Sequence, residues 1–111
     1  MNENPFNPVA EVSALDDLLA RSHTAPVVLF KHSATCSISA DVYRDVAKYD
    51  NEIALVVVQT ARPLSNEIAA RTGIRHESPQ AIVLRNGKAV WHAAHYDISA
   101  AVLRRAVLEN S

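Results

Sequence analysis

The sequence predicts an α/β fold, a mixed four-stranded sheet with helices on both faces, and three observations lead to it. Short runs of β-branched residues alternate with longer stretches whose apolar residues recur at helical spacing. The dipeptide Asn86-Gly87 separates the last two apolar runs and is a strong hairpin signal. The element order is therefore α-β-α-β-α-β-β-α, with parallel strands joined through helices and a final antiparallel pair. A chain of 111 residues that is 49% hydrophobic can bury a core of its own.

The first elements follow a polar N-terminal segment. Residues 1–8 contain two prolines, so we expect a flexible arm there and a single domain over residues 9–111. A helix should begin near Ser13, whose spacing to Asp16 matches a capping box with aspartate in place of the usual glutamate. One face of this helix carries its apolar residues, which are Val12, Leu15, Leu18 and Leu19.

The middle of the chain alternates strands and helices. Residues 26–30 and 53–58 are apolar runs, as expected of strands buried on both faces of a sheet. A helix is expected over residues 40–48 between them. Pro63 suits the first turn of a third helix, and Gly73 suits its end.

The last third of the chain predicts a hairpin followed by a helix. Residues 81–84 and 89–92 flank the Asn86-Gly87 turn and form the predicted antiparallel pair. Asp97 can cap the last helix. The apolar face of this helix consists of Ile98, Val102, Leu103, Ala106 and Val107.

Composition and net charge bear on which partners the protein can bind and on the compartment in which it is expected. The net charge of −1 gives no general attraction to nucleic acid or to an anionic membrane, so neither is expected as a partner. The apolar stretches are far shorter than the roughly 18 residues that a membrane helix needs. The first residues lack the basic and apolar regions of a secretory signal. With one cysteine and no such signal, we expect a cytoplasmic protein.

The single cysteine, Cys36, is the main functional candidate. It lies in a polar turn between the predicted strand over residues 26–30 and the helix that follows. A helix start offers unpaired backbone N–H groups and the positive end of the helix dipole, and both favour the reactive thiolate. A buried core cysteine is the alternative, since free cysteines are often buried. Ser39 stands where a dithiol oxidoreductase carries its second cysteine, so disulfide chemistry here needs an external thiol.

The element order also resembles the thioredoxin-type arrangement, whose active-site cysteine lies at this same strand-to-helix junction. Thioredoxin-like proteins place a cis-proline just before the third core strand, facing the cysteine. Pro79 occupies that place here. The resemblance therefore implies a cis Ser78-Pro79 bond near Cys36, with the Ser78 backbone free to pair with an incoming disulfide.

A more specific resemblance is to the monothiol bacilliredoxins, which carry a Thr-Cys-Pro-Ile-Ser signature and act on mixed disulfides of bacillithiol. Thr35-Cys36-Ser37-Ile38-Ser39 matches it except at Ser37, which replaces the proline. Serine restores an N–H beside the sulfur that proline lacks, and the sequence predicts no direction for the effect. The similarity runs from about Val12 to the last helix. Three further segments share it: Arg62 to Ala69, Arg75 to Gln80, and Trp91-His92.

The resemblance implies an enzyme, a thiol–disulfide oxidoreductase that removes bacillithiol from S-bacillithiolated client proteins. Cys36 would take the bacillithiol as a mixed disulfide, and a second bacillithiol would release it. Bacillithiol is then a co-substrate, no cofactor is bound permanently, and an NADPH-dependent bacillithiol disulfide reductase is an indirect partner.

The expected site has a catalytic residue, a supporting set and a substrate-binding set. Cys36 is the nucleophile, and Thr35, Ser37 and Ser39 are expected to support its thiolate. The substrate-binding candidates are Arg75, His76, Ser78 and Pro79. Bacillithiol has a malate moiety with two carboxylates, and an arginine fork suits such groups, so Arg75 is the favoured anion contact and Arg62 a weaker one.

Lys31 and His32 are cationic candidates, and the five histidines raise the question of a metal site. Lys31 and His32 precede the cysteine closely and could stabilise a negative sulfur or form a solvated strand end. No metal site is expected, because His92 and His95 straddle a strand end without an acidic or thiol ligand nearby.

Two alternative functions stay open at this point. A monothiol glutaredoxin would use glutathione, but that class carries Cys-Gly-Phe-Ser and a glycine pair that this chain lacks. A non-catalytic, redox-sensing or client-binding module would react once at Cys36 and stop. Repeated turnover on a mixed disulfide separates the enzymes from the sensor.

Overall fold

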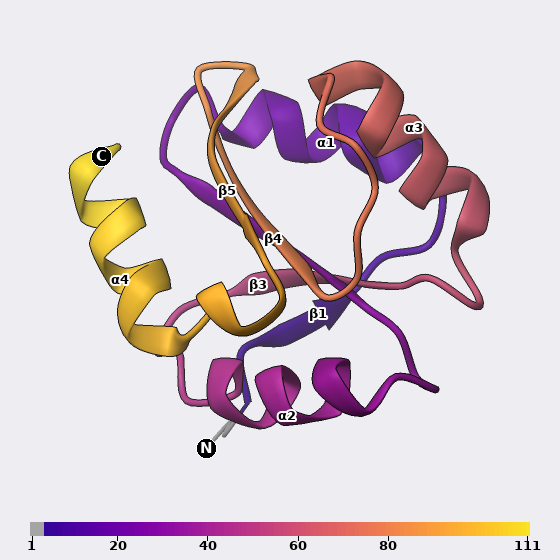
Figure 1. The fold of residues 1–111 in the computed structure, drawn as a ribbon. Helices are drawn as coiled ribbons and strands as arrows, with labels where there is room; N and C mark the ends of the chain where they lie inside the picture. The colour runs from indigo at the N-terminus through magenta and orange to yellow at the C-terminus, as the bar shows by residue number, and fades with distance from the viewer. Residues whose placement is uncertain (1–3) are drawn as a thin grey trace.

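The computed structural model describes residues 4–111, in which five strands form one sheet with helices packed on it (Figure 1). The strands are β1 Phe6–Pro8, β2 Val27–His32, β3 Ile53–Val57, β4 Gln80–Arg85 and β5 Lys88–Ala94. The helices are α1 Ser13–Arg21, α2 Ser37–Val46, α3 Arg62–Thr72 and α4 Ala100–Glu109, with a 3₁₀ turn η1 at His95–Asp97. The α/β class and the order of the longer elements are as predicted.

The sheet has one strand more than the predicted four in the described part of the chain. The additional strand is β1, which pairs in parallel with β3 and places Phe6 opposite Ile53. The prediction of a flexible arm over residues 1–8 is therefore wrong for residues 6–8, and residues 1–3 lie outside the described residues. Three residues with a proline at an edge give no alternating pattern from which to predict a strand. The Phe6 ring instead anchors the segment by stacking on Tyr43 of α2, with ring centroids 4.4 Å apart.

The helices cover both faces of the sheet, as predicted (Figure 1). Alternate residues of β2 point to opposite faces, which builds two apolar cores from one strand. Val28 and Phe30 pack with residues of α2 and α4, and Val27 and Leu29 pack with residues of α1 and α3. The α2/α4 face and the α1/α3 face are named accordingly below.

The strand order β1-β3-β2-β4-β5 places β2 in the centre of the sheet. β2 runs parallel to β3 and antiparallel to β4, with Lys31 opposite Gln80. The predicted hairpin is confirmed, because Asn86 and Gly87 both adopt positive φ angles, 55° and 80°. The antiparallel pairing brings the C-terminal end of β2 beside the segment that leads into β4.

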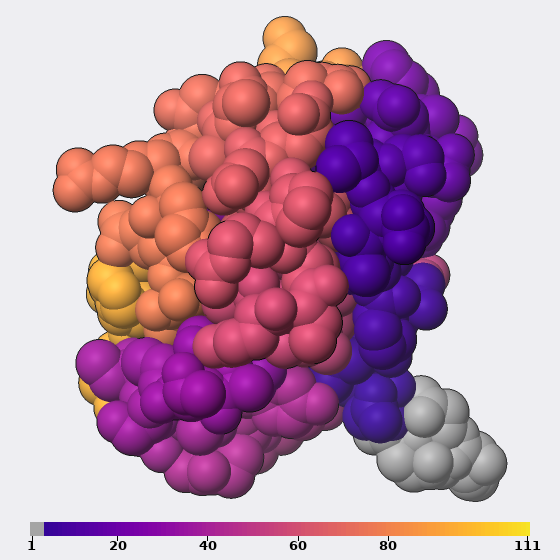
Figure 2. Space-filling model, turned by 90° about the vertical axis from the view of Figure 1, so that its right-hand side faces the viewer, coloured from indigo at the N-terminus to yellow at the C-terminus, as the bar shows by residue number. Residues whose placement is uncertain are grey.

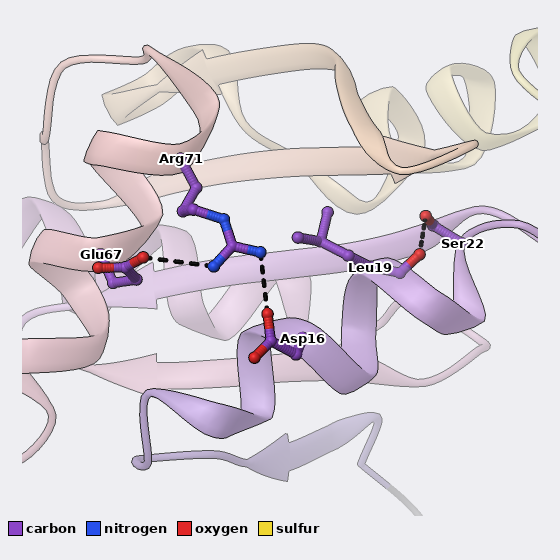
Figure 3. A network of polar contacts seen from close by, with 5 residues as sticks. All are labelled: Asp16, Leu19, Ser22, Glu67 and Arg71. Carbon is purple, nitrogen blue, oxygen red and sulfur yellow. Dashed lines mark hydrogen bonds and ion pairs between the residues drawn. The ribbon is translucent and has the colours of Figure 1, made fainter.

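The start of α1 differs from the prediction. Its N-cap is Val12, in helical conformation and without a side-chain hydrogen bond, so the Ser13–Asp16 capping box does not form. Asp16 instead accepts a hydrogen bond of 2.9 Å from Arg71, which also bonds Glu67 on its own helix at 3.3 Å (Figure 3). Arg71 thereby connects α3 to α1 on the surface.

The start of α4 also differs. Ser99 is the N-cap and its hydroxyl accepts the Val102 N–H at 3.1 Å, whereas Asp97 belongs to η1. The helix therefore begins later than the Asp97 cap predicts, and η1 at His95–Asp97 forms the tight turn next to the site described below. The longest described helix, α3, has 11 residues, and no helix within residues 4–111 is both long and apolar enough to cross a membrane.

Candidate active site

Cys36 lies at the junction of β2 and α2, as predicted, and α2 begins directly after it. It is the N-cap of the helix, in extended conformation, and its carbonyl accepts the Ala40 N–H at 3.0 Å. The side chain is partly exposed, so the alternative of a buried core cysteine is wrong. The first N–H groups of a helix have no partner inside it, and the first turn of α2 contains no acidic residue. A negative sulfur at this position therefore meets a favourable electrostatic environment.

Ser39 is buried one turn into α2, where its hydroxyl connects the helix to the end of β2. The hydroxyl oxygen accepts the Ser33 N–H at 3.0 Å and lies 2.8 Å from Nδ1 of His32. Burial lowers the pKa of His32, so this ring is neutral at pH 7. Ser39, which was predicted to support the thiolate, thus holds the backbone of Ser33, three residues before Cys36. Ser37 is exposed at the first helical position, beside the sulfur-bearing residue.

A residue that the sequence did not suggest, Gln59, holds the turn before Cys36. It follows β3, and its amide oxygen accepts the Ala34 N–H at 3.0 Å. Its amide nitrogen donates to the hydroxyls of Ser33 and Thr35 at 2.9 Å and 3.3 Å. Both the oxygen and the nitrogen of the amide form hydrogen bonds, so Gln59 fixes the three residues that precede the cysteine. No motif marks it, because the contact joins two turns that are 24 to 26 residues apart along the chain.

The turn over residues 33–35, with Gln59 and Ser39, forms the first wall of the site, and the segment before β4 forms the second. The Ser78-Pro79 bond is cis, as the resemblance implied. Pro79 is buried and its carbonyl accepts the His95 N–H at 3.0 Å, which joins this segment to η1. Ser78 is partly exposed, and Arg75 and His76 are exposed. The structure therefore places all four predicted substrate-binding residues on one connecting segment that ends beside β2.

Tyr96 of η1 is a second residue that the sequence did not suggest. Its side chain is 64% exposed, and its hydroxyl donates to Asp41 of α2 at 2.9 Å. This hydrogen bond raises the pKa of Tyr96, and the charges of Asp41 and of the Cys36 thiolate add to the effect. Tyr96 thereby joins η1 to α2, the helix that begins directly after Cys36. Its exposed aromatic ring offers a contact surface for an incoming partner.

These segments share one end of the sheet, the end where β2 and β3 finish and β4 begins. In Figure 2, the start of α2 (purple, lower left), α3 (rose, centre) and the segment before β4 (orange, left) meet on one face of the molecule. No group of three or more histidine, cysteine or acidic side chains within residues 4–111 is arranged to hold a metal ion. His95 instead contacts Glu77 at 3.4 Å.

A family model described as monothiol bacilliredoxin BrxC matches residues 7–103 of the chain. The chain belongs to this family. Membership places it among the thioredoxin-fold oxidoreductases, with Cys36 as its only cysteine.

Solved structures agree on the fold. One described as a candidate oxidoreductase with a thioredoxin fold is 33% identical, covers 92% of this chain and 93% of its own, and gives a TM-score of 0.84. Thioredoxin from Trypanosoma brucei brucei is 18% identical, with 97% and 92% coverage and a TM-score of 0.74. Reduced Schistosoma mansoni thioredoxin pre-protein is 19% identical, with 96% and 98% coverage and a TM-score of 0.70. The last two likenesses bear on the fold alone.

Lys31, a candidate for stabilising the sulfur, lies on the face of the sheet opposite the helix that follows Cys36. Its side chain is fully buried on the α1/α3 face, where the ammonium donates to the Ser65 carbonyl at 3.1 Å and contacts Nδ1 of His76 at 3.2 Å. Burial lowers its pKa to about 8. The sequence left open direct support of the sulfur or a solvated strand end. Both are wrong for Lys31, because its ammonium is buried on the face of the sheet opposite α2. Alternation along β2 explains the difference, because Lys31 shares the face of Leu29.

Proposed function

We propose that this chain is a monothiol bacilliredoxin in activity as well as in family, removing bacillithiol from S-bacillithiolated proteins through a mixed disulfide at Cys36. The observation that carries the proposal is the partly exposed Cys36 at the start of α2, with the buried hydroxyl of Ser39 at the position of a resolving cysteine. A nucleophilic thiol without an internal partner suits exchange with an external thiol.

The reaction consists of two thiol–disulfide exchanges. The Cys36 thiolate attacks the bacillithiol sulfur of the client's mixed disulfide, the S–S bond breaks, and the client thiolate leaves and takes a proton from water. A second bacillithiol thiolate then attacks the bacillithiol sulfur on Cys36. Bacillithiol disulfide leaves and the Cys36 thiolate is restored, so the client sulfur is reduced and the second bacillithiol is oxidised, while the first bacillithiol remains in a disulfide. An NADPH-dependent disulfide reductase would return the bacillithiol disulfide to its thiol form.

The two walls of the site have separate tasks in this scheme. The first wall consists of Gln59, Ser39 and the turn over residues 33–35 that both of them hold, and it fixes the attacking sulfur. The second wall offers the Ser78 backbone to the incoming disulfide and the exposed Arg75 guanidinium to a carboxylate of bacillithiol. Alignment of three sulfurs is the main requirement, because the exchange itself is intrinsically feasible for a thiolate.

Mass spectrometry and turnover test the proposal together. Oxidised bacillithiol should add one bacillithiol to Cys36, and free bacillithiol should remove it again. With a bacillithiolated client protein as substrate, this cycle should repeat many times. Oxidised glutathione, assayed in parallel, should react more slowly. Faster turnover with glutathione would reassign the co-substrate, and a single modification without turnover would make the chain a sensor.

A further inference from the structure

Lys31 has an unusual position for a charged side chain. It is fully buried, and fully buried lysines are rare unless the ammonium is paired. Two of its three N–H groups have acceptors, the Ser65 carbonyl at 3.1 Å and Nδ1 of His76 at 3.2 Å. The site described above uses neither contact, although His76 lies on the substrate-binding segment.

The chemistry of the pair fixes the proton on His76. An ammonium group donates and never accepts, so the Nδ1 atom that faces Lys31 must carry a lone pair. The Ser65 hydroxyl also lies 3.3 Å from Nδ1 and can donate to the same lone pair. A neutral imidazole with an accepting Nδ1 carries its hydrogen on Nε2.

The surroundings keep the ring neutral and favour an anion next to it. Burial lowers the pKa of His76, as do the positive charges of Lys31 and Arg62, against an opposing effect of Glu77. Glu77 is itself close to His95, at 3.4 Å. The residue as a whole is exposed although its Nδ1 side is partly covered, and within residues 4–111 its Nε2 atom has no hydrogen-bond partner. An exposed N–H close to the two cations Lys31 and Arg62 suits a carboxylate oxygen.

We propose that buried Lys31 is a positioning residue, which holds His76 as the neutral Nε2–H tautomer so that this N–H binds a carboxylate of the low-molecular-weight thiol. The proposal rests on the proposed function, since it assigns part of the binding of that thiol. Lys31 acts from the opposite face of the sheet to Cys36, so it affects binding of the thiol and leaves the reactivity of the sulfur unchanged.

Nuclear magnetic resonance of the ¹⁵N-labelled chain tests the positioning directly. At pH 7, His76 should be the Nε2–H tautomer with the shift of a hydrogen-bonded Nδ1. In Lys31→Met the hydrogen-bond shift of Nδ1 should shrink, because only the Ser65 hydroxyl can still donate to this atom, and the titration midpoint of His76 should rise. Lys31→Gln, which keeps an N–H donor without the charge, should retain the shift. An Nδ1–H tautomer in the wild type, or spectra of His76 that Lys31→Met leaves unchanged, would overturn the proposal.

Kinetics test the carboxylate contact. His76→Ala should raise KM for bacillithiol about tenfold, the size expected for one charge-assisted hydrogen bond, with kcat nearly unchanged. His76→Gln, which keeps a donor near the Nε2 position, should recover most of the loss. His23→Gln, an exposed histidine outside the site, is the matched control and should behave as the wild type. With bacillithiol methylated at both carboxylates, wild type and His76→Ala should have the same KM.

The two arms separate failure of the inference from failure of the proposed function. A wild-type chain without turnover on bacillithiol would refute the function and, with it, the carboxylate contact, while the spectra would still decide whether Lys31 fixes His76. Normal turnover with an unchanged KM in His76→Ala would refute the carboxylate contact alone.

Discussion

Lys31 and His32 are neighbours at the end of β2, yet they serve opposite faces of the sheet. Lys31 points to the α1/α3 face and contacts Ser65 and His76. His32 points to the α2/α4 face, where it contacts the Ser39 hydroxyl and its ring packs at a tilt against Tyr43, with ring centroids 4.6 Å apart. The first contact leads to the substrate-binding segment, and the second leads to the helix that begins after Cys36.

The difference shows how one strand end can organise both walls of a site. Successive residues of a strand alternate between faces, so two adjacent polar residues reach two separate layers. Burial lowers the pKa of both side chains, but an ammonium must find acceptors, whereas a neutral imidazole can share a proton with a hydroxyl. Variants on the two faces should therefore separate binding of the thiol from reactivity of the sulfur.

Cys36→Ser removes the sulfur that both walls serve, and it should have the largest effect. De-bacillithiolation should fall to background, a loss of at least about a thousandfold, because a serine hydroxyl is not ionised at neutral pH. The melting temperature should stay within a few degrees, since a partly exposed N-cap residue contributes little packing. Turnover above background in this variant would show that Cys36 is not the nucleophile.

Lys31→Met should reveal the free-energy cost of burying a cation on the α1/α3 face. The pKa of Lys31 is lowered to about 8 in the folded chain, from 10.5. Between these values the unfolded chain binds more protons, so the free energy of unfolding of the wild type should rise with pH from about 8 upward. The difference between wild type and Lys31→Met should change by up to about 3 kcal/mol toward pH 10.

Chemical denaturation of both chains from pH 7 to pH 10 measures this difference. Comparing the two chains cancels the tyrosines, which titrate in both. Lys48→Met, at an exposed lysine, should follow the wild-type curve. Parallel curves for wild type and Lys31→Met would mean that the buried side chain does not lose its proton near pH 8.

Gln59 tests the wall on the α2 side from outside β2. Gln59→Ala removes three hydrogen bonds to residues 33–35, so alkylation of Cys36 and turnover should both slow about tenfold, which corresponds to part of the free energy that the three bonds contribute. Gln59→Glu keeps the acceptor for Ala34 but loses both donors and adds a negative charge near the thiolate. Its alkylation profile should shift to higher pH.

Thr60→Ala is the matched control, because Thr60 follows Gln59 and its hydroxyl bonds only the Val57 carbonyl of its own turn. It should leave alkylation unchanged. An alkylation profile of Gln59→Glu that superimposes on the wild type would show that this side chain lies outside the electrostatic environment of the sulfur.

The sequence predicted the parts of this molecule that have local signals. The apolar runs, the Asn86-Gly87 turn and Gly73 at the end of α3 predicted their elements, and the resemblance added the cis bond before Pro79. It could not predict β1, which has no pattern of its own and depends on Phe6 packing against Tyr43. Gln59 and the partners of Lys31 were also missed, because those contacts join segments distant in sequence.

His32→Phe should have the smallest effect and gives the sharpest contrast with Lys31. Phenylalanine keeps the ring contact with Tyr43 and loses only the contact with Ser39. Because the lowered pKa of His32 leaves the ring neutral at pH 7, the variant loses a hydrogen bond and no charge. Alkylation of Cys36 should slow about threefold, which corresponds to a weak neutral hydrogen bond, without dependence on salt. KM for bacillithiol should stay unchanged, unlike in the His76 variants.

A double-mutant cycle with Ser39→Ala measures the pair itself. If His32 acts through Ser39, the double variant should be no slower than Ser39→Ala alone, because the second substitution then removes a contact already lost. Additive losses would mean that His32 reaches the sulfur by another route. A loss that shrinks as salt is added would mean that it acts as a cation. The salt-dependent result would break the contrast between a buried cation on the α1/α3 face and a neutral ring on the α2/α4 face, since the two last residues of β2 would then differ only in the face to which they point.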